Sequence, residues 1–120
     1  MILYIYSKCS TCQNALAFLK QKGVVFTCKE ITQTPPTVEE LGKMLSFLQG
    51  DLKKLFNSSG QLYRELKLSE KLKEMTQSQA LSLLSHHGML IKRPFLLRSD
   101  FGLTGFRETE WSLLPFGCIN

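Results

Sequence analysis

The sequence predicts an α/β protein, in which a four-stranded mixed β-sheet has flanking helices and an all-helical insertion between its second and third strands. Three observations support this prediction. An apolar run at residues 2–6 is followed directly by a Cys-x-x-Cys turn and an amphipathic helix. Helical patterns then occupy about residues 37–87. Strand patterns return only at residues 95–97 and 101–106, close enough together to pair antiparallel.

The first three elements form a strand, helix and strand unit. The helix after residues 2–6 begins near Ser10 and ends at Gly23, since glycine accepts the left-handed backbone that often follows a helix. Residues 24–28 are β-branched and aromatic, which indicates a second strand. So short a unit predicts a parallel pair with a right-handed connection. Cys28 falls within this strand and is expected to be buried and inert.

The helical insertion has clear starting signals. A proline pair at 35–36 prevents a helix before Thr37, which forms a capping box with Glu40. A second capping box at residues 76–79 opens a helix that ends at Gly88. The first of these helices presents an apolar stripe of Val38, Leu41, Leu45 and Leu48. Shorter helical pieces are expected at residues 51–56, 62–66 and 70–72, the last capped by Ser69.

The end of the chain adds a hairpin and a helix. A turn at residues 98–100 joins the two late strands. Residues 108–114 predict a final helix with Trp111 packed inward. Residues 116–120 are expected to be a tail in which Cys118 is exposed or frayed.

Composition and charge narrow the functional classes. The 120 residues suit a single domain, and 43% hydrophobic with 21% charged residues is typical of a soluble globular protein. No apolar run is long enough for a membrane span or an export signal, so no membrane partner and a cytoplasmic location are expected. The net charge of +5 suits an anionic substrate or an acidic partner. The lysines are too dispersed to indicate direct nucleic-acid binding.

The Cys9-x-x-Cys12 turn is the strongest functional signal. A helix N-terminus lowers the pKa of a thiol, and Lys8 adds a positive charge beside it. Cys9 stands at or before the first turn and is therefore the expected nucleophile. Cys12, about one helical turn later, can attack the resulting mixed disulfide and release the product.

Other roles for two spaced cysteines remain open. The pair resembles half of a zinc site, but no second half is present, because Cys28 and Cys118 are single and the two histidines are adjacent. No metal is therefore expected. A structural disulfide would close too short a loop to stabilise much. Two thiols buried by chance are the remaining alternative. The strand before the turn and the helix after it favour redox chemistry over all of these.

A second constellation, Lys92-Arg93-Pro94, leads into the third strand. Thioredoxin-like folds carry a proline at this place, commonly cis, opposite the active cysteine. Pro94 is assigned a structural role on this basis, although the sequence leaves its isomer open. In such a fold Arg93 would lie beside Cys9, stabilise its thiolate and bind an oxyanion or a carboxylate. The alternative is that both basic residues are solvated charges flanking a buried strand.

Five motifs occur in one order and spacing: Cys9-Ser10-Thr11-Cys12, Phe56-Asn57-Ser58-Ser59-Gly60, Tyr63-Arg64-Glu65-Leu66, Ile91-Lys92-Arg93-Pro94 and Gly105-Phe106. The set resembles the arsenate-reductase-like family, which includes glutaredoxin-coupled arsenate reductases (ArsC) and the Spx and MgsR regulators. The resemblance covers residues 2 to about 114 and implies a thioredoxin-like fold.

The resemblance also implies roles for particular residues. Cys9 matches the nucleophile of the reductases, Asn14 an asparagine that helps to hold the cysteine loop, and Arg93 an oxyanion-binding arginine. The reductases carry further arginines in the turn at 57–60, where this chain has none, and at Phe106. Arg107, adjacent to Phe106, is the expected substitute.

Three functions are compatible with these residues. The first is a thiol-disulfide oxidoreductase in which Cys9 attacks and Cys12 resolves, with no bound cofactor and with glutathione or glutaredoxin as electron donor. The second is an Spx-type, redox-switched transcriptional regulator that binds RNA polymerase, which the second cysteine favours. The third is a glutaredoxin-dependent arsenate reductase acting on a small oxyanion. A monomer is expected in each case.

Overall fold

The computed structural model describes residues 1–116. Its sheet has the strand order β2-β1-β3-β4. The strands are β1 (Ile2–Ile5), β2 (Thr27–Glu30), β3 (Phe95–Leu97) and β4 (Gly102–Thr104). β1 pairs parallel with β2 and antiparallel with β3, and β3 pairs antiparallel with β4. The predicted four-stranded mixed sheet is therefore confirmed.

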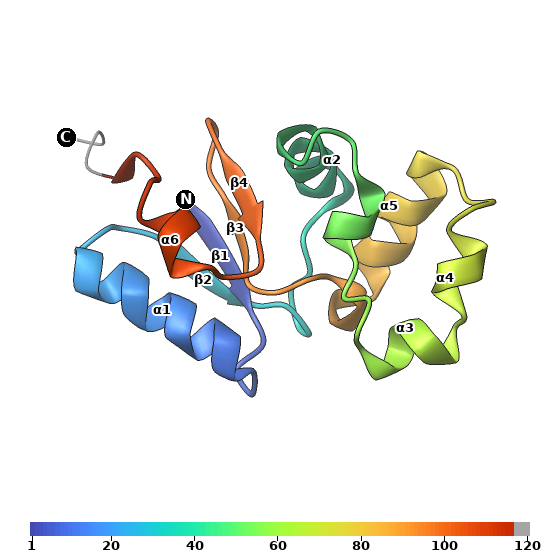
Figure 1. The fold of residues 1–120 in the computed structure, drawn as a ribbon, viewed down its shortest axis with the longest axis horizontal. Coiled ribbons are helices and arrows are strands. Elements are labelled where there is room, and N and C mark those ends of the chain that lie inside the picture. Colours follow the sequence, from blue (N-terminus) through green and yellow to red (C-terminus); the bar gives the residue numbers. More distant parts are fainter. Residues whose placement is uncertain (117–120) are drawn as a thin grey trace.

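Alternating side chains give the sheet two buried faces. Leu3, Ile5 and Leu96 belong to one hydrophobic cluster, together with residues of α1 (Ser10–Lys22) and with Trp111 of α6 (Glu108–Trp111). Tyr4 and Phe95 point the other way, into a second cluster with the helical insertion. Figure 1 shows α1 and α6 on one side of the sheet and the insertion on the other.

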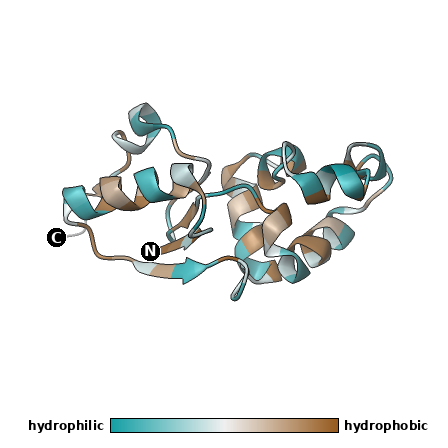
Figure 2. Cartoon of the chain, turned by 90° about the horizontal axis from the view of Figure 1, so that it is seen from below, coloured by the Kyte–Doolittle hydropathy of each residue, from teal (hydrophilic) through white to brown (hydrophobic). Residues whose placement is uncertain are grey.

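The named elements of the insertion between β2 and β3 are all helices, as predicted, and one isolated β-bridge joins Phe56 to Ile91. It contains α2 (Val38–Phe47), the 3₁₀ helix η1 (Leu52–Leu55), α3 (Gln61–Glu65), α4 (Leu68–Lys71), α5 (Gln77–His86) and the 3₁₀ helix η2 (Gly88–Leu90). Both predicted capping boxes are present, with Thr37 accepting from Glu40 N and Thr76 accepting from Gln79 N. Hydrophobic and hydrophilic residues alternate along these helices (Figure 2).

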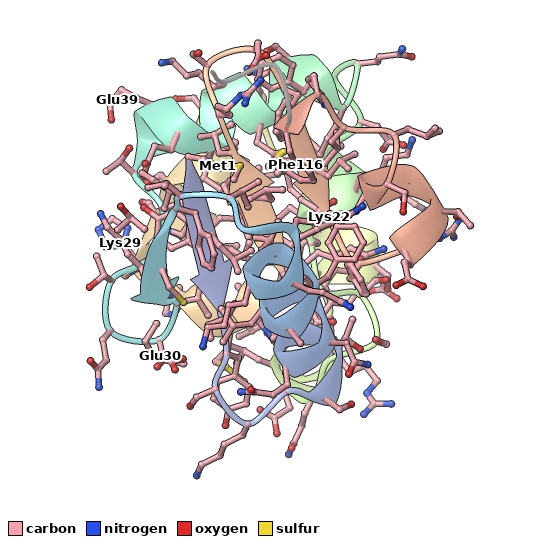
Figure 3. The ribbon with its side chains drawn as sticks, turned by 90° about the vertical axis from the view of Figure 1, so that its left-hand side faces the viewer. Met1, Lys22, Lys29, Glu30, Glu39 and Phe116 are labelled. Atoms are coloured by element: carbon pink, nitrogen blue, oxygen red, sulfur yellow. The ribbon has the colours of Figure 1, made fainter. Side chains whose placement is uncertain are left out.

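The second strand lies later in the chain than predicted, at residues 27–30 rather than 24–28. Strand pairing explains the shift, because β1 begins at Ile2 and Ile2 is already opposite Thr27. Residues 24–26 therefore have no strand beside them, and Val25 is 89% exposed. The expectation that Cys28 is buried was wrong: its side chain is exposed on an edge strand. Figure 3 shows Lys29 and Glu30 at this edge, beside α1.

Smaller corrections concern helix ends. Val38 is 43% exposed because it stands at the first position of α2, whereas the helix buries Leu41, Met44 and Leu45. Lys67, not Ser69, precedes α4, and its backbone is left-handed (φ 54°). The last helix ends at Trp111 and not at residue 114, as the sequence had predicted. Trp111 is buried, as expected. The prediction for Cys118 concerns a position outside the described residues.

None of the helices within residues 1–116 is both long and apolar enough to cross a membrane.

Candidate active site

Cys9 occupies the N-cap position of α1. Its own backbone is extended (φ −96°, ψ 122°), and its N–H donates to Tyr6 O at 3.0 Å, which fixes the turn after β1. The backbone N–H groups of Thr11 and Cys12 lower the pKa of the Cys9 thiol, although its sulfur forms no capping hydrogen bond with them. These are the second and third helical residues, whose N–H groups have no partner within a helix. The Cys9 thiol thus stands at the N-cap position, next to N–H groups that have no partner within the helix.

Opposing influences act on the pKa of Cys9. Partial burial, the largest single influence, raises it. The Cys12 N–H, the Cys12 thiol and the Thr11 N–H lower it, as does the positive charge of Arg93. Together these outweigh burial, and the pKa lies below that of an ordinary thiol. The site therefore favours a thiolate at Cys9.

Cys12 has the opposite electrostatic character. Its side chain is fully buried, and this burial is the main reason why its pKa rises to about 12. The neighbouring Cys9 raises it further, while the Tyr6 N–H, 3.5 Å from the Cys12 sulfur, lowers it. Both cysteines are free thiols in this structure. The raised pKa therefore favours the protonated thiol at Cys12.

Arg93 reaches the cysteine turn from the segment before β3. Its Nη1 donates to Met89 O at 3.2 Å and Ile91 O at 3.4 Å, and its guanidinium lies 5.3 Å from the centre of the Tyr6 ring. The Arg93–Pro94 peptide bond is cis, and Pro94 is buried. Arg93 Nε is buried without a hydrogen-bond partner among residues 1–116. The arginine is thus held by the fold rather than solvated as a flanking charge.

Cys9 opens into a pocket of about 390 Å³. Three basic residues line it with Cys9, namely Lys92, Arg93 and Arg107. Asn57 and Ser59, from the loop before α3, line it as well. That loop is brought here by a β-bridge between Phe56 and Ile91 and by a hydrogen bond from Asn57 N to Leu90 O at 2.7 Å.

Two of the expected site residues lie elsewhere. Lys8 is exposed and does not line the Cys9 pocket. Asn14 lines a different pocket, next to Phe106, and its side chain makes no hydrogen bond within the described part of the chain. The cysteine turn is held instead by Gln13 Nε2, which donates to Ser7 O at 2.8 Å, and by Ser7 N, which donates to Glu30 Oε1 at 3.0 Å.

These missed contacts had weak signals in the sequence. Gln13 directly follows the second cysteine, but a polar residue there is also an ordinary solvent-facing position. Asn57 stands in a recognised turn, yet its approach to Cys9 depends on pairing between residues 35 positions apart in sequence. Within residues 1–116, no group of three or more histidine, cysteine, aspartate or glutamate side chains is arranged to hold a metal ion.

The alkylation rate of Cys9 should follow the pKa described above. We expect its dependence on pH to have a midpoint below the value of about 8.5 for an ordinary thiol. Substituting Arg93→Gln removes a positive charge that favours the thiolate, so the midpoint should move upward. Iodoacetamide labelling followed by peptide mass spectrometry measures both rates, with exposed Cys28 as the internal reference. An identical midpoint in the two proteins would show that Arg93 does not act on this thiol.

A parallel β1–β2 pair connected through α1, with β3 and β4 added antiparallel, is the sheet of a thioredoxin-like protein. Residues 4–113 match the ArsC family, and the chain belongs to that family.

Several relatives resemble the chain over most of its length. It is 40% identical to YusI of Bacillus subtilis, with 92% of this chain and 94% of YusI covered. It is 26% identical to the global transcriptional regulator Spx of Streptococcus mutans, over 90% of this chain and 77% of Spx. A crystal structure from Streptococcus mutans, described as a possible arsenate reductase, is 36% identical with a TM-score of 0.84. The match covers 93% of this chain and 97% of that one.

Proposed function

We propose that this protein is a thiol-disulfide oxidoreductase in which Cys9 is the nucleophile and Cys12 the resolving thiol. One observation carries the proposal: Cys9 lines the pocket while Cys12, one helical turn later, is fully buried, and their pKa values are displaced in opposite directions. A thiolate at the mouth of a pocket, beside a protonated thiol with no exposed surface, suits a two-step exchange.

In the first step the Cys9 thiolate attacks one sulfur of a substrate disulfide. A Cys9–substrate disulfide forms, the substrate S–S bond breaks, and the other substrate sulfur leaves as a thiolate. The basic residues of the pocket stabilise that leaving charge. Because Cys12 is fully buried, an external disulfide reaches Cys9 and not Cys12.

The first step itself activates Cys12. Once Cys9 is in a mixed disulfide, its negative charge no longer opposes ionisation of Cys12. The Tyr6 N–H and Arg93 still favour the Cys12 thiolate. Cys12 then loses its proton to solvent and attacks the Cys9 sulfur, which closes a Cys9–Cys12 disulfide and releases the second substrate thiolate. The pair has then given two electrons to the substrate, and glutathione or glutaredoxin is the proposed donor that restores it.

The test is a stoichiometric exchange followed by recycling. The reduced protein is mixed with hydroxyethyl disulfide, and the released thiol is measured together with the protein mass. We expect a product lighter by two hydrogens, with the linkage mapped to Cys9 and Cys12. Adding glutathione, with or without glutaredoxin, should then restore the dithiol form. A Cys28→Ser variant is the control and should react like the unmodified protein, while an unreactive Cys9 would refute the proposal.

Reduction of arsenate is a second candidate, favoured by one observation. Arg93, Arg107 and Lys92 line the pocket that contains Cys9, and such side chains bind oxyanions. The neutral side chains of Asn57 and Ser59 and the carboxylate of Glu110 line the same pocket. Arsenate-dependent oxidation of NADPH, coupled through glutathione and glutaredoxin, measures this activity. A rate no higher than that of Cys9→Ser would exclude it.

A redox-switched regulator is a third candidate, favoured by the similarity to Spx over 90% of this chain together with the cysteine pair. In this case the same disulfide would control docking on RNA polymerase instead of supplying turnover. Binding of the purified, oxidised and reduced chain to RNA polymerase tests it directly. No binding in either state would exclude it.

A further inference from the structure

A second pocket, of about 350 Å³, adjoins the one at Cys9. The two pockets share four lining residues, Lys92, Thr104, Arg107 and Glu110. The second extends away from Cys9 to the end of α2, where Phe47 and Leu48 line it, and to Lys54 in η1. We call the two pockets together the basic groove, since Lys54, Lys92 and Arg107 line it.

The charges of the basic groove are not neutralised within the described residues. None of the side chains of Lys54, Lys92, Arg107 and Glu110 forms an ion pair or hydrogen bond with another group in residues 1–116. Four cations, Lys54, Lys92, Arg93 and Arg107, against the one carboxylate of Glu110 leave a net positive groove. At the end of α2 the N–H groups of residues 48–50 donate to the carbonyls of Met44, Leu45 and Ser46, which reduces the negative potential of these carbonyls.

Lys92 lies where the pocket at Cys9 adjoins the second pocket. An added Cβ at Gly105 would lie 3.1 Å from Lys92 Cε, so the lysine stem runs close over this glycine between the two pockets. Thr104 Oγ1 donates to Lys54 O at 2.8 Å, which joins β4 to η1 beside the second pocket. Apolar surface accompanies the charges, since Phe47 is 36% exposed.

We propose that the basic groove binds an acidic segment of a polypeptide whose cysteine disulfide is reduced at Cys9. This inference rests on the proposed function and specifies its substrate. A small oxyanion would occupy only the pocket at Cys9, whereas a polypeptide continuing past its cysteine would enter the second pocket. There its carboxylates meet Lys54, Lys92 and Arg107, and an apolar side chain meets Phe47.

The reaction is the exchange described above. Cys9 forms a disulfide with the polypeptide cysteine as the polypeptide S–S bond breaks, and Cys12 then displaces the polypeptide thiolate. The polypeptide disulfide is the oxidant and the Cys9–Cys12 pair the reductant. The basic groove contributes binding only, and its positive field speeds the encounter with an acidic segment.

The test compares two peptide disulfides of equal length that differ only in having Asp and Glu, or Asn and Gln, beside the cysteine. Second-order rate constants for their reduction are measured with the unmodified protein, with Lys54→Gln and with Lys71→Gln. Lys54 lines only the far pocket, so its replacement leaves the surroundings of Cys9 in place. Lys71 is an exposed lysine of α4 outside the basic groove, and it serves as the matched loss of charge.

The unmodified protein and Lys71→Gln should prefer the acidic peptide, and Lys54→Gln should lower that preference by about two- to five-fold. The preference should also shrink when salt shortens the Debye length from about 30 Å at 0.01 M to about 3 Å at 1 M. Equal rates on both peptides, or a preference unaltered in Lys54→Gln, would overturn the basic groove as a subsite and leave the exchange chemistry intact. Failure to reduce either peptide would overturn both proposals. Glutathione disulfide is the third substrate, and a rate matching that of the acidic peptide would overturn the polypeptide assignment.

Discussion

Replacing Cys9 with serine is expected to abolish disulfide reduction, with a loss of roughly three orders of magnitude or more. Serine is a favourable N-cap residue, so a hydroxyl at this position suits the start of α1. The helix start should therefore be preserved while the nucleophile is lost. The rate of thiol release from hydroxyethyl disulfide measures the effect, and circular dichroism verifies that the fold is kept.

The Cys12→Ser variant separates the two steps. Cys9 should still attack, but no thiol remains to displace it, so a mixed disulfide at Cys9 should accumulate and be detectable by mass spectrometry. A variant that turns over normally through a single thiol would rule out Cys12 as the resolving residue.

The sequence was informative wherever a local pattern decides the structure. The capping boxes at Thr37 and Thr76 were identified in advance because the residues that close them are three positions apart. Gly23 was also identified, and its left-handed backbone (φ 70°) ends α1. The Cys9-x-x-Cys12 turn was placed at a helix start on the same local grounds. In each case the decisive contacts lie within one helical turn.

The predictions failed where the structure depends on contacts between residues that are far apart in the sequence. Residues 24–26 have strand composition, but whether they pair depends on where β1 begins, and β1 begins too late for them. Cys28 was expected to be inside because its strand was not known to be an edge. Asn57 enters the pocket only because the bridge between Phe56 and Ile91 brings the insertion loop there. No spacing within the sequence encodes such an approach.

The family resemblance identified site residues that the local sequence patterns did not. It indicated Arg93 and Arg107, which line the same pocket as Cys9 although they are more than 80 residues later. It also indicated Asn14, whose side chain makes no hydrogen bond to the cysteine turn; Gln13 and Glu30 hold that turn instead. A residue role transferred by position therefore needs the contacts of this chain before it can be used.

The largest effect on stability is expected at Trp111. Its side chain has no exposed surface, and its ring centre lies 4.9 Å from that of Phe106 and 6.2 Å from that of Phe18, with near-perpendicular planes in both pairs. Its Nε1 donates to Gly105 O at 3.2 Å. Trp111→Ala removes this packing and leaves a cavity, so the free energy of unfolding should fall by about 3–5 kcal/mol.

Two further variants serve as controls for this prediction. Trp111→Phe keeps an aromatic ring but leaves Gly105 O without its donor, and it should be destabilised by less than the alanine variant. Leu113→Ala lies two residues later at an 86% exposed position, and its unfolding free energy should change by no more than about 0.5 kcal/mol. Urea denaturation measures the unfolding free energy of all three variants.

Because Gly105, Phe106 and Arg107 line the pocket at Cys9 and follow directly from β4, the packing of Trp111 also sets the position of Arg107. Trp111→Phe should therefore alter the rate of disulfide reduction, whereas Leu113→Ala should not. If the two variants reduced the disulfide at the same rate, the packing of Trp111 would have no effect on the site.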